Sequence, residues 1–159
     1  MPSNNADEIV PRLWLGNVRA SVDEGFLHDR NIQVVFNCTK NLPFSYMVPI
    51  RYRIPVDDNL QEEEIRNMAL WSVEIAHKIM SEYNKGKTIL VHCMAGMQRS
   101  AAAVAFFLIA NNRMKMEDAM AYIRQRRPIA FTPGANFEDS IKYFTKEWQT
   151  NILPHVRYI

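Results

Sequence analysis

Cysteine is scarce in this sequence, which contains only Cys38 and Cys93 among 159 residues. Two cysteines cannot build the disulfide scaffold of a small secreted domain. No cluster of histidine and cysteine has the spacing of zinc ligands either. We therefore expect no metal and no other cofactor, and we expect any covalent chemistry to belong to a thiol.

Long apolar runs and a strong excess of one charge are also missing. The longest apolar run, residues 101–110, is too short to span a bilayer and is typical of a buried helix. The N-terminal residues lack the basic start and apolar run of a signal peptide, so we expect a cytoplasmic or nuclear protein without membrane contact. The net charge of +2 is too small to indicate a nucleic-acid partner, and the oligomeric state stays open.

What is present is the composition of an ordinary globular domain, with 48% hydrophobic and 23% charged residues. The length suits one core, and no repeat or linker divides the chain, so residues 1–159 are expected to form a single domain. Apolar, β-branched runs predict buried strands at residues 31–39, 51–56 and 88–93. Residues 9–16 predict an edge strand or one arm of a hairpin.

Between these runs, apolar residues at three- and four-residue spacing predict helices. The clearest helix runs from Ile65 to Tyr83, and further helices are expected at residues 22–30, 99–112, 116–127 and 136–149. Strands that alternate with helices indicate an α/β fold with a central, mainly parallel, twisted sheet and helices on both of its faces.

The segment VHCMAGMQRS, residues 91–100, contains a strand end, a loop and a helix start in that order. Ligands of open α/β sheets bind beyond the carboxyl ends of the strands. Backbone N–H groups in such a loop can converge on one point and, with the start of the helix, bind an anion. Gly96 permits a backbone conformation that a Cβ would resist. The expected phosphate-binding residues are Met94, Ala95, Gly96, Met97, Gln98 and Arg99.

Cys93 lies at the end of the strand in this segment. Thiols near helix N-termini and cations ionise more readily than free thiols, so we expect a nucleophilic thiolate. The planar fork of Arg99 can hold two phosphate oxygens, and Ser100 can donate a hydrogen bond that stabilises the sulfur as a leaving group. The alternative for Cys93 is a small buried hydrophobe. The glycine and arginine at the offsets that an anion needs favour the nucleophile.

The pattern C-x5-R, with histidine before and serine after it, resembles the signature loop of cysteine-dependent protein phosphatases. HCMAGMQRS is most similar to the dual-specificity branch, and YRIPVDDN, RQRRPIAFTPGANF and LWLGN resemble further segments of that family. The likeness extends from about residue 9 to residue 148, and the short length resembles the small atypical members. It implies a cysteine phosphatase-like fold and hydrolysis of phosphotyrosine, phosphoserine or phosphothreonine in phosphoprotein substrates through a phosphocysteine intermediate.

The resemblance also places a general acid in YRIPVDDN. The departing oxygen needs a proton, and Asp57 and Asp58 follow the predicted strand. Adjacent loop residues can both reach a site, so the physics leaves the choice open. The resemblance to the family favours Asp58. Each aspartate alone is more often a turn former.

Three further residues are expected to support the site. His92 is expected to fix the loop by hydrogen bonding, and its alternative is a buried core histidine. Asn136 resembles the family asparagine that braces the phosphate loop, and its alternative is a helix N-cap. Arg127, in the cluster IRQRRP, is either part of a solvated helix end or a contact, like Arg126 or Lys40, for a second substrate phosphate.

Gln98 departs from the serine that many dual-specificity enzymes have before the arginine. Its amide is expected to position the attacking water or to contact substrate, and the alternative is a solvent-facing loop residue. Cys38 ends the strand expected beside residues 88–93. Some relatives form a reversible disulfide between such a cysteine and the catalytic one, which makes Cys38 a candidate redox partner. A plain core cysteine is the favoured alternative, because cysteine is so often buried.

Three other functions are alternatives. The loop has no lysine, whereas phosphoinositide phosphatases of this superfamily often carry lysines there. It has alanine where RNA 5′-triphosphatases carry histidine before the glycine. A phosphopeptide-binding adaptor usually lacks the cysteine or the arginine, and both are present here. A phosphoprotein is therefore the leading substrate.

Overall fold

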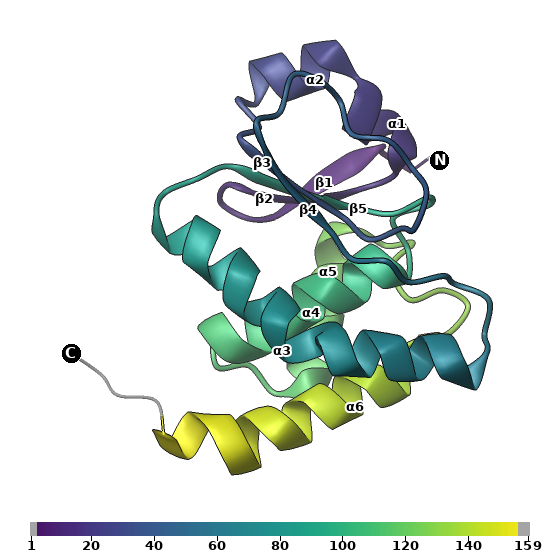
Figure 1. Cartoon of the computed structure of the whole chain (residues 1–159), viewed down its shortest axis with the longest axis vertical. Coiled ribbons are helices and arrows are strands. Elements are labelled where there is room, and N and C mark those ends of the chain that lie inside the picture. Colours follow the sequence, from purple (N-terminus) through teal and green to yellow (C-terminus); the bar gives the residue numbers. More distant parts are fainter. Residues whose placement is uncertain (1–2, 156–159) are drawn as a thin grey trace.

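A five-stranded sheet forms the centre of the computed structural model, which describes residues 3–155 (Figure 1). The strands lie in the order β1-β2-β5-β3-β4. β1 and β2 pair antiparallel, whereas every other pair is parallel. The predicted α/β fold with a mainly parallel sheet is therefore confirmed. The bounds are Ala6–Val10 for β1, Leu13–Gly16 for β2, Val34–Asn37 for β3, Ile50–Arg53 for β4 and Ile89–His92 for β5.

Helices cover both faces of the sheet (Figure 1). The short helices α1 (Val18–Val22) and α2 (Glu24–Asp29) lie on the face drawn at the top, and the four longer helices lie on the other face. All positions of β3 and β5 are buried, as expected for strands covered on both sides. The longer helices are α3 (Glu62–Asn84), α4 (Arg99–Asn111), α5 (Met116–Arg126) and α6 (Glu138–Glu147).

Helix α4 lies at the centre of the larger layer, where it contacts α3, α5 and α6. Its residues 100–110 are all buried, which confirms that the longest apolar run is a buried helix. No helix within residues 3–155 is both long enough and apolar enough to cross a membrane. The position of α4 matters for the site, because its first residue directly follows the loop after β5.

The carboxyl ends of three strands meet at one edge of the sheet. β5 lies between β2 and β3, and His92 at its end pairs with Gly16 on one side and with Asn37 on the other. The chain leaves β5 at Cys93, so the cysteine emerges at the middle of this edge. This is the position at which open α/β sheets bind ligands.

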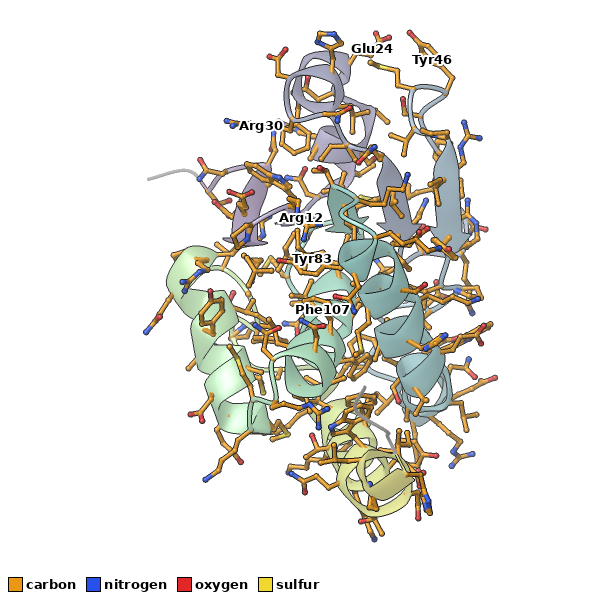
Figure 2. All side chains as sticks on the ribbon, turned by 90° about the vertical axis from the view of Figure 1, so that its left-hand side faces the viewer. Arg12, Glu24, Arg30, Tyr46, Tyr83 and Phe107 are labelled. Carbon is orange, nitrogen blue, oxygen red and sulfur yellow. The ribbon has the colours of Figure 1, made fainter. Side chains whose placement is uncertain are left out.

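The N-terminal hairpin is tied to the helical layer through Arg12, which lies in its turn (Figure 2). The Arg12 guanidinium lies over the Tyr83 ring, 4.2 Å from its centroid, and donates to the carbonyls of Tyr83 and Lys87 at 3.0 and 2.9 Å. The Tyr83 ring in turn meets Phe107 of α4 edge-on, at 5.1 Å between centroids. These contacts join the hairpin to α3 and α4.

Sequence and structure differ mostly at element boundaries. Residues 9–16 contain the end of β1 and all of β2, because Arg12 adopts a positive φ of 73° that closes a hairpin. Helix α1 was not predicted, since five residues are too few for a periodic apolar pattern. The last helix is shorter than residues 136–149 and continues into a π-helical turn at Trp148–Ile152.

Candidate active site

The carbonyl groups of the loop after β5, residues 94–98, are all bonded to groups outside its interior. The carbonyl of Met94 accepts the N–H of Val18 at 3.1 Å, and that of Met97 accepts the N–H of Phe131 at 2.8 Å. The carbonyl of residue 98 starts the hydrogen-bond ladder of α4. In a planar trans peptide the C=O and the following N–H point in opposite directions. The N–H groups of the following residues therefore turn inward, and within residues 3–155 none of those of residues 95–98 has an acceptor.

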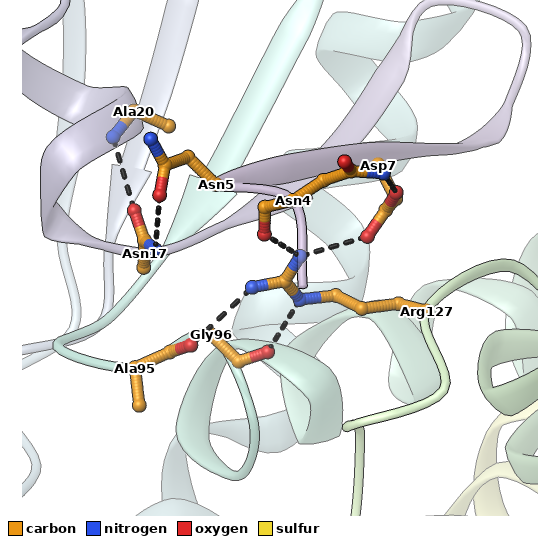
Figure 3. Close-up of polar contacts among 8 residues, drawn as sticks. All are labelled: Asn4, Asn5, Asp7, Asn17, Ala20, Ala95, Gly96 and Arg127. Atoms are coloured by element: carbon orange, nitrogen blue, oxygen red, sulfur yellow. Dashed lines mark hydrogen bonds and ion pairs between the residues drawn. The ribbon is translucent and has the colours of Figure 1, made fainter. Parts of the chain in front are cut away.

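Arg127 donates hydrogen bonds to the two remaining carbonyls of the loop, those of Ala95 and Gly96 (Figure 3). Its side chain is fully buried, and it donates from Nε to Gly96 O at 2.8 Å and from Nη2 to Ala95 O at 3.3 Å. The third nitrogen, Nη1, donates to Asn4 O and forms an ion pair with Asp7, both at 2.8 Å. One guanidinium thus orients two peptides of the loop and connects them to β1.

This position corrects one expectation for the arginine cluster. Arg127 is neither solvated nor available to a second substrate phosphate, because its side chain has no exposed surface and all three nitrogens have partners. Arg126 is exposed and lies over the Tyr122 ring, 3.5 Å from its centroid. The sequence could not indicate the role of Arg127, since its counter-ion Asp7 lies 120 residues away.

Gly96 is required by conformation and by space. Its φ is +67°, a region that residues with a Cβ rarely adopt. A Cβ there would lie 2.5 Å from the Gly16 carbonyl oxygen and 2.8 Å from Nη2 of Arg127. The loop can therefore lie close to the end of β2 and to its buried arginine only with glycine at this position.

Cys93 is 3% exposed, and its sulfur lies 3.0 Å from Oγ of Ser100 in the first turn of α4. Nδ1 of His92 lies 3.3 Å from the Cys93 carbonyl oxygen. Burial lowers the pKa of His92 to about 4, so the ring is neutral at physiological pH. The predicted contact of Ser100 with the sulfur is thus present. His92 contacts its neighbour Cys93, its Nε2 has no partner among residues 3–155, and its role in fixing the loop stays a prediction.

Arg99 contains an unpartnered buried donor. Its Nη1 donates to the Val56 carbonyl at 3.0 Å, but its Nε is buried and has no partner in the described part of the chain. A buried donor without an acceptor costs free energy, so the geometry indicates that an anion completes this site. Beside it lies a hollow of about 240 Å³, lined by Thr39, Lys40, Asn41, Leu42, Asp57, Met94 and Arg99.

The two candidate acids have different partners. The Asp57 carboxylate lies 3.2 Å from Nζ of Lys40, which also binds Glu64 at 2.7 Å. The hydrogen bond to Glu64, and to a smaller extent that to Asp57, raises the pKa of Lys40. Asp58 is exposed, and its Oδ1 accepts a hydrogen bond of 2.9 Å from the side chain of Asn136. Asp57 lines the hollow beside Arg99, whereas Asp58 lies one residue further on, held by a neutral amide.

The side chain of Gln98 lies in none of the places expected for it. It is 6% exposed, and its amide nitrogen donates to the carbonyls of Thr132 and Gly134 at 3.1 and 2.8 Å. Its amide oxygen accepts the backbone N–H of Asn136 at 2.9 Å. Both amide hydrogens are used within the protein, so the side chain neither faces solvent nor serves a substrate or an attacking water.

Asn136 is not a helix N-cap, because α6 begins at Glu138 and Phe137 occupies its N-cap position. Through its backbone and side chain, Asn136 instead contacts Gln98 of the phosphate loop and Asp58 of the acid segment. Asn136 thus contacts the phosphate loop through its backbone N–H, and its role in bracing the loop stays a prediction. The contact of its side chain with the acid segment is an addition that the sequence did not suggest.

Cys38 directly follows β3, and its N–H donates to the His92 carbonyl at 2.8 Å. Burial, with a smaller effect from Cys93, raises the pKa of the Cys38 thiol. Both cysteines are free and buried. The structure therefore places Cys38 just beyond the end of β3, next to the end of β5 from which Cys93 emerges, and the disulfide stays a prediction. Within the described range, no three acidic, histidine or cysteine side chains gather to hold a metal.

Comparisons with known proteins agree with this geometry. The family model described as "Dual specificity phosphatase, catalytic domain" matches residues 13–147. Dual specificity protein phosphatase 2 of Mus musculus is 32% identical over 149 residues, covering 93% of this chain and 44% of that protein. Dual specificity protein phosphatase Mpk3 of Drosophila melanogaster is 30% identical over 155 residues, covering 95% and 36%. The chain thus spans less than half the length of these curated relatives.

Solved structures share the fold. Human DUSP28 superposes with a TM-score of 0.78 at 22% identity, covering 94% of this chain and 98% of that one. The human tyrosine phosphatase-like serine/threonine/tyrosine-interacting protein has a TM-score of 0.78 at 24% identity, covering 91% and 98%. With a family match across most of its length and a loop of this geometry, the chain belongs to the dual specificity phosphatase family.

Proposed function

We propose that this chain removes phosphate from tyrosine, serine or threonine side chains of proteins through a phosphocysteine intermediate on Cys93. The observation that carries the proposal is the loop that directly follows Cys93. Its carbonyls are all bonded outside its interior, and Arg99 at its end has a buried Nε without a partner within residues 3–155. Such a site stabilises the three equatorial oxygens of a transferring phosphoryl group, which is the main requirement of this reaction.

In the first step, the Cys93 sulfur attacks phosphorus and the bond from phosphorus to the substrate oxygen breaks. The loop N–H groups and Arg99 hold the equatorial oxygens, and a carboxylic acid gives its proton to the departing oxygen. In the second step, water attacks phosphorus, and the same carboxylate takes a proton from it. The bond to sulfur then breaks, and the hydroxyl of Ser100, 3.0 Å away, stabilises the thiolate that leaves.

Asp58 is the proposed acid. It is held by the neutral amide of Asn136 at one oxygen, so its other oxygen can carry the proton. Asp57, in contrast, forms an ion pair with Lys40, and its backbone N–H binds Glu64 at 2.9 Å. Its carboxylate is therefore engaged in holding the segment. The position of Asp57 beside the hollow of Arg99 makes it the alternative.

A phosphoprotein is the proposed substrate class. The loop offers backbone N–H groups and the guanidinium of Arg99, enough for a single phosphate, and residues 94–98 contain no lysine that could meet a second one. Lys40 is already paired with two carboxylates. A phosphopeptide-binding adaptor is the second candidate, favoured by the likeness in fold to the tyrosine phosphatase-like interacting protein.

The experiment that tests the proposal compares the wild type with Cys93→Ser. The wild type is expected to hydrolyse p-nitrophenyl phosphate and phosphopeptides, with inhibition by vanadate. Cys93→Ser is expected to lose turnover and to keep phosphopeptide binding, because the loop and Arg99 remain. Turnover retained in Cys93→Ser would overturn the mechanism. Binding without turnover in the wild type would favour the adaptor, and preferred hydrolysis of RNA 5′-triphosphate or phosphoinositide would change the substrate class.

A further inference from the structure

We propose that Gln98 and Asn136 are positioning residues for the Asp58 carboxyl group, so that the phosphate loop itself aims the general acid. The inference rests on the proposed function. It assigns a role to the one residue by which this loop departs from the usual family pattern.

All hydrogen-bonding groups of the Gln98 side chain have partners within the protein. Its three hydrogen bonds, of 2.8 to 3.1 Å, all go to the backbone of residues 132–136. At 6% exposure, water cannot replace these bonds. A serine in this place could not span them, because its hydroxyl has one hydrogen and a shorter reach. Gln98 therefore fixes the path of a segment that lies 34 to 38 residues further along the chain.

Asn136 connects Gln98 with Asp58 through two hydrogen bonds. Its backbone N–H is held by Gln98 Oε1, and its side-chain Nδ2 donates to Asp58 Oδ1 at 2.9 Å. The contact with Asp58 is exposed, and an exposed hydrogen bond between two freely rotating side chains contributes little. It becomes effective when one partner is already held in place, because less conformational freedom is lost on forming it. The bond from Gln98 holds the backbone of that partner.

The residues that precede Asp58 in the acid segment are held by other elements. The Val56 carbonyl accepts from Arg99, and Asp57 binds Lys40 and Glu64 through its carboxylate and its N–H. These contacts fix the peptide between Val56 and Asp57, which directly precedes Asp58. Of all these contacts, the bond from Asn136 is the one that reaches the Asp58 carboxyl group itself. It occupies one oxygen and leaves the other free to carry the proton to the departing oxygen.

The test uses the wild type, Asn136→Ala and Gln98→Ser, with phenyl phosphate as a poor leaving group and p-nitrophenyl phosphate as a good one. A misplaced acid matters most when the departing oxygen needs a proton. We therefore expect kcat for phenyl phosphate to fall about tenfold in each variant, a fraction of the full acid effect. The fall for p-nitrophenyl phosphate is expected to be several times smaller. Gln125→Ser, at an exposed glutamine of α5, is the matched control and should show neither change.

Two further measurements separate positioning from general damage. Vanadate inhibition should stay within about twofold of the wild type, which corresponds to about 0.4 kcal/mol, if the anion site is intact. In an Asp58→Asn background, Asn136→Ala should have no additional effect, because the group that it positions is gone. Asn136→Ala keeps the backbone N–H that binds Gln98, so it tests the proposal even if Gln98→Ser does not fold.

Equal losses on both substrates, weaker vanadate inhibition, or a full additional loss in the Asp58→Asn background would overturn the inference and leave the proposed function standing. A wild type without Cys93-dependent hydrolysis would overturn the proposed function, and this inference with it.

Discussion

Nε of Arg127 donates to the carbonyl oxygen of Gly96 at 2.8 Å from a position with no exposed surface. A guanidinium in such a place is costly unless every donor has a partner and the charge is neutralised. Asp7 of β1 supplies the charge, and three backbone carbonyls supply the remaining acceptors. The shape of the phosphate loop therefore depends on β1, a strand near the N-terminus of the chain.

The ion pair between Arg127 and Asp7 can be tested by substitution of the carboxylate. Asp7→Asn leaves a buried cation without its counter-ion, so we expect the free energy of unfolding to fall by about 3 kcal/mol. Vanadate inhibition should weaken as well, because the two loop carbonyls lose their fixed donor. Urea unfolding and inhibition assays measure both effects, and Glu8→Gln, at the exposed neighbour in β1, is the control. A loss no greater than that of the control would contradict this role.

Gly96→Ala tests the close approach of the loop to β2. The new Cβ would meet backbone at 2.5 Å and the residue would keep a φ of +67°, so the loop must shift or the fold must strain. We expect a loss of roughly 2 kcal/mol of stability, combining overpacking with backbone strain. Activity should fall further than stability alone explains, because the N–H groups move. Gly134→Ala is the matched control, since a Cβ there meets nothing within 4 Å. Full activity in Gly96→Ala would show that the loop tolerates a Cβ.

Local patterns in the sequence explain why much of the site could be predicted. Cys93, Arg99 and Ser100 belong to one strand, loop and helix start, so their mutual positions follow from local geometry. The contact between Ser100 and the sulfur follows from the same geometry. The parallel sheet was predictable for a similar reason, because apolar runs alternate with amphipathic helices.

The parts that were not predicted depend on contacts between distant segments. Gln98 was expected to face solvent, substrate or water, because nothing in its neighbourhood reveals that residues 132–136 fold back against it. The Arg127–Asp7 pair and the five-residue helix α1 are similar cases. Composition and periodicity describe faces of elements, but they do not specify which loop meets which.

His92 is expected to make stability depend on pH. Burial lowers its pKa from 6.5 to about 4, so the folded state keeps a neutral ring over a range in which the unfolded chain takes up a proton. The stabilisation is complete above pH 6.5 and is lost as the pH falls towards 4. Between pH 7 and pH 4.5 the protonation of this residue should therefore lower the free energy of unfolding by about 2.5 kcal/mol. His92→Asn should lose less stability over that interval in urea unfolding, whereas His77→Gln, at an exposed position of α3, should behave like the wild type. Parallel curves for wild type and His92→Asn would exclude this origin.

The two aspartates can be separated by their effect on different leaving groups. Asp58→Asn should lower kcat for phenyl phosphate by about a hundredfold or more, the usual contribution of a general acid. The loss on p-nitrophenyl phosphate should be far smaller. Asp57→Asn removes the ion pair with Lys40 and should lower both rates by a similar, modest factor. If Asp57→Asn shows the larger dependence on the leaving group, then the acid is Asp57.

The two cysteines are expected to form a disulfide under mild oxidation. Cys38 and Cys93 follow the paired ends of β3 and β5, and neighbouring strands lie about 4.8 Å apart, which is within the range that a disulfide can bridge. Peroxide would convert the Cys93 thiolate to a sulfenic acid with release of hydroxide. The Cys38 sulfur would then attack the oxidised sulfur, forming the S–S bond while the oxygen leaves as water.

The pH dependence of that second step provides a direct check. Burial raises the pKa of the Cys38 thiol, and the attacking species is the thiolate, so disulfide formation should be slow at neutral pH and accelerate as the pH rises. Mass spectrometry after peroxide treatment should find a peptide pair linked through Cys38 and Cys93, and dithiothreitol should restore activity. In Cys38→Ser the same treatment should give irreversible sulfinic acid at Cys93. If no linked pair forms at any pH, and Cys38→Ser recovers as fully as the wild type, then Cys38 is a core residue without a redox role.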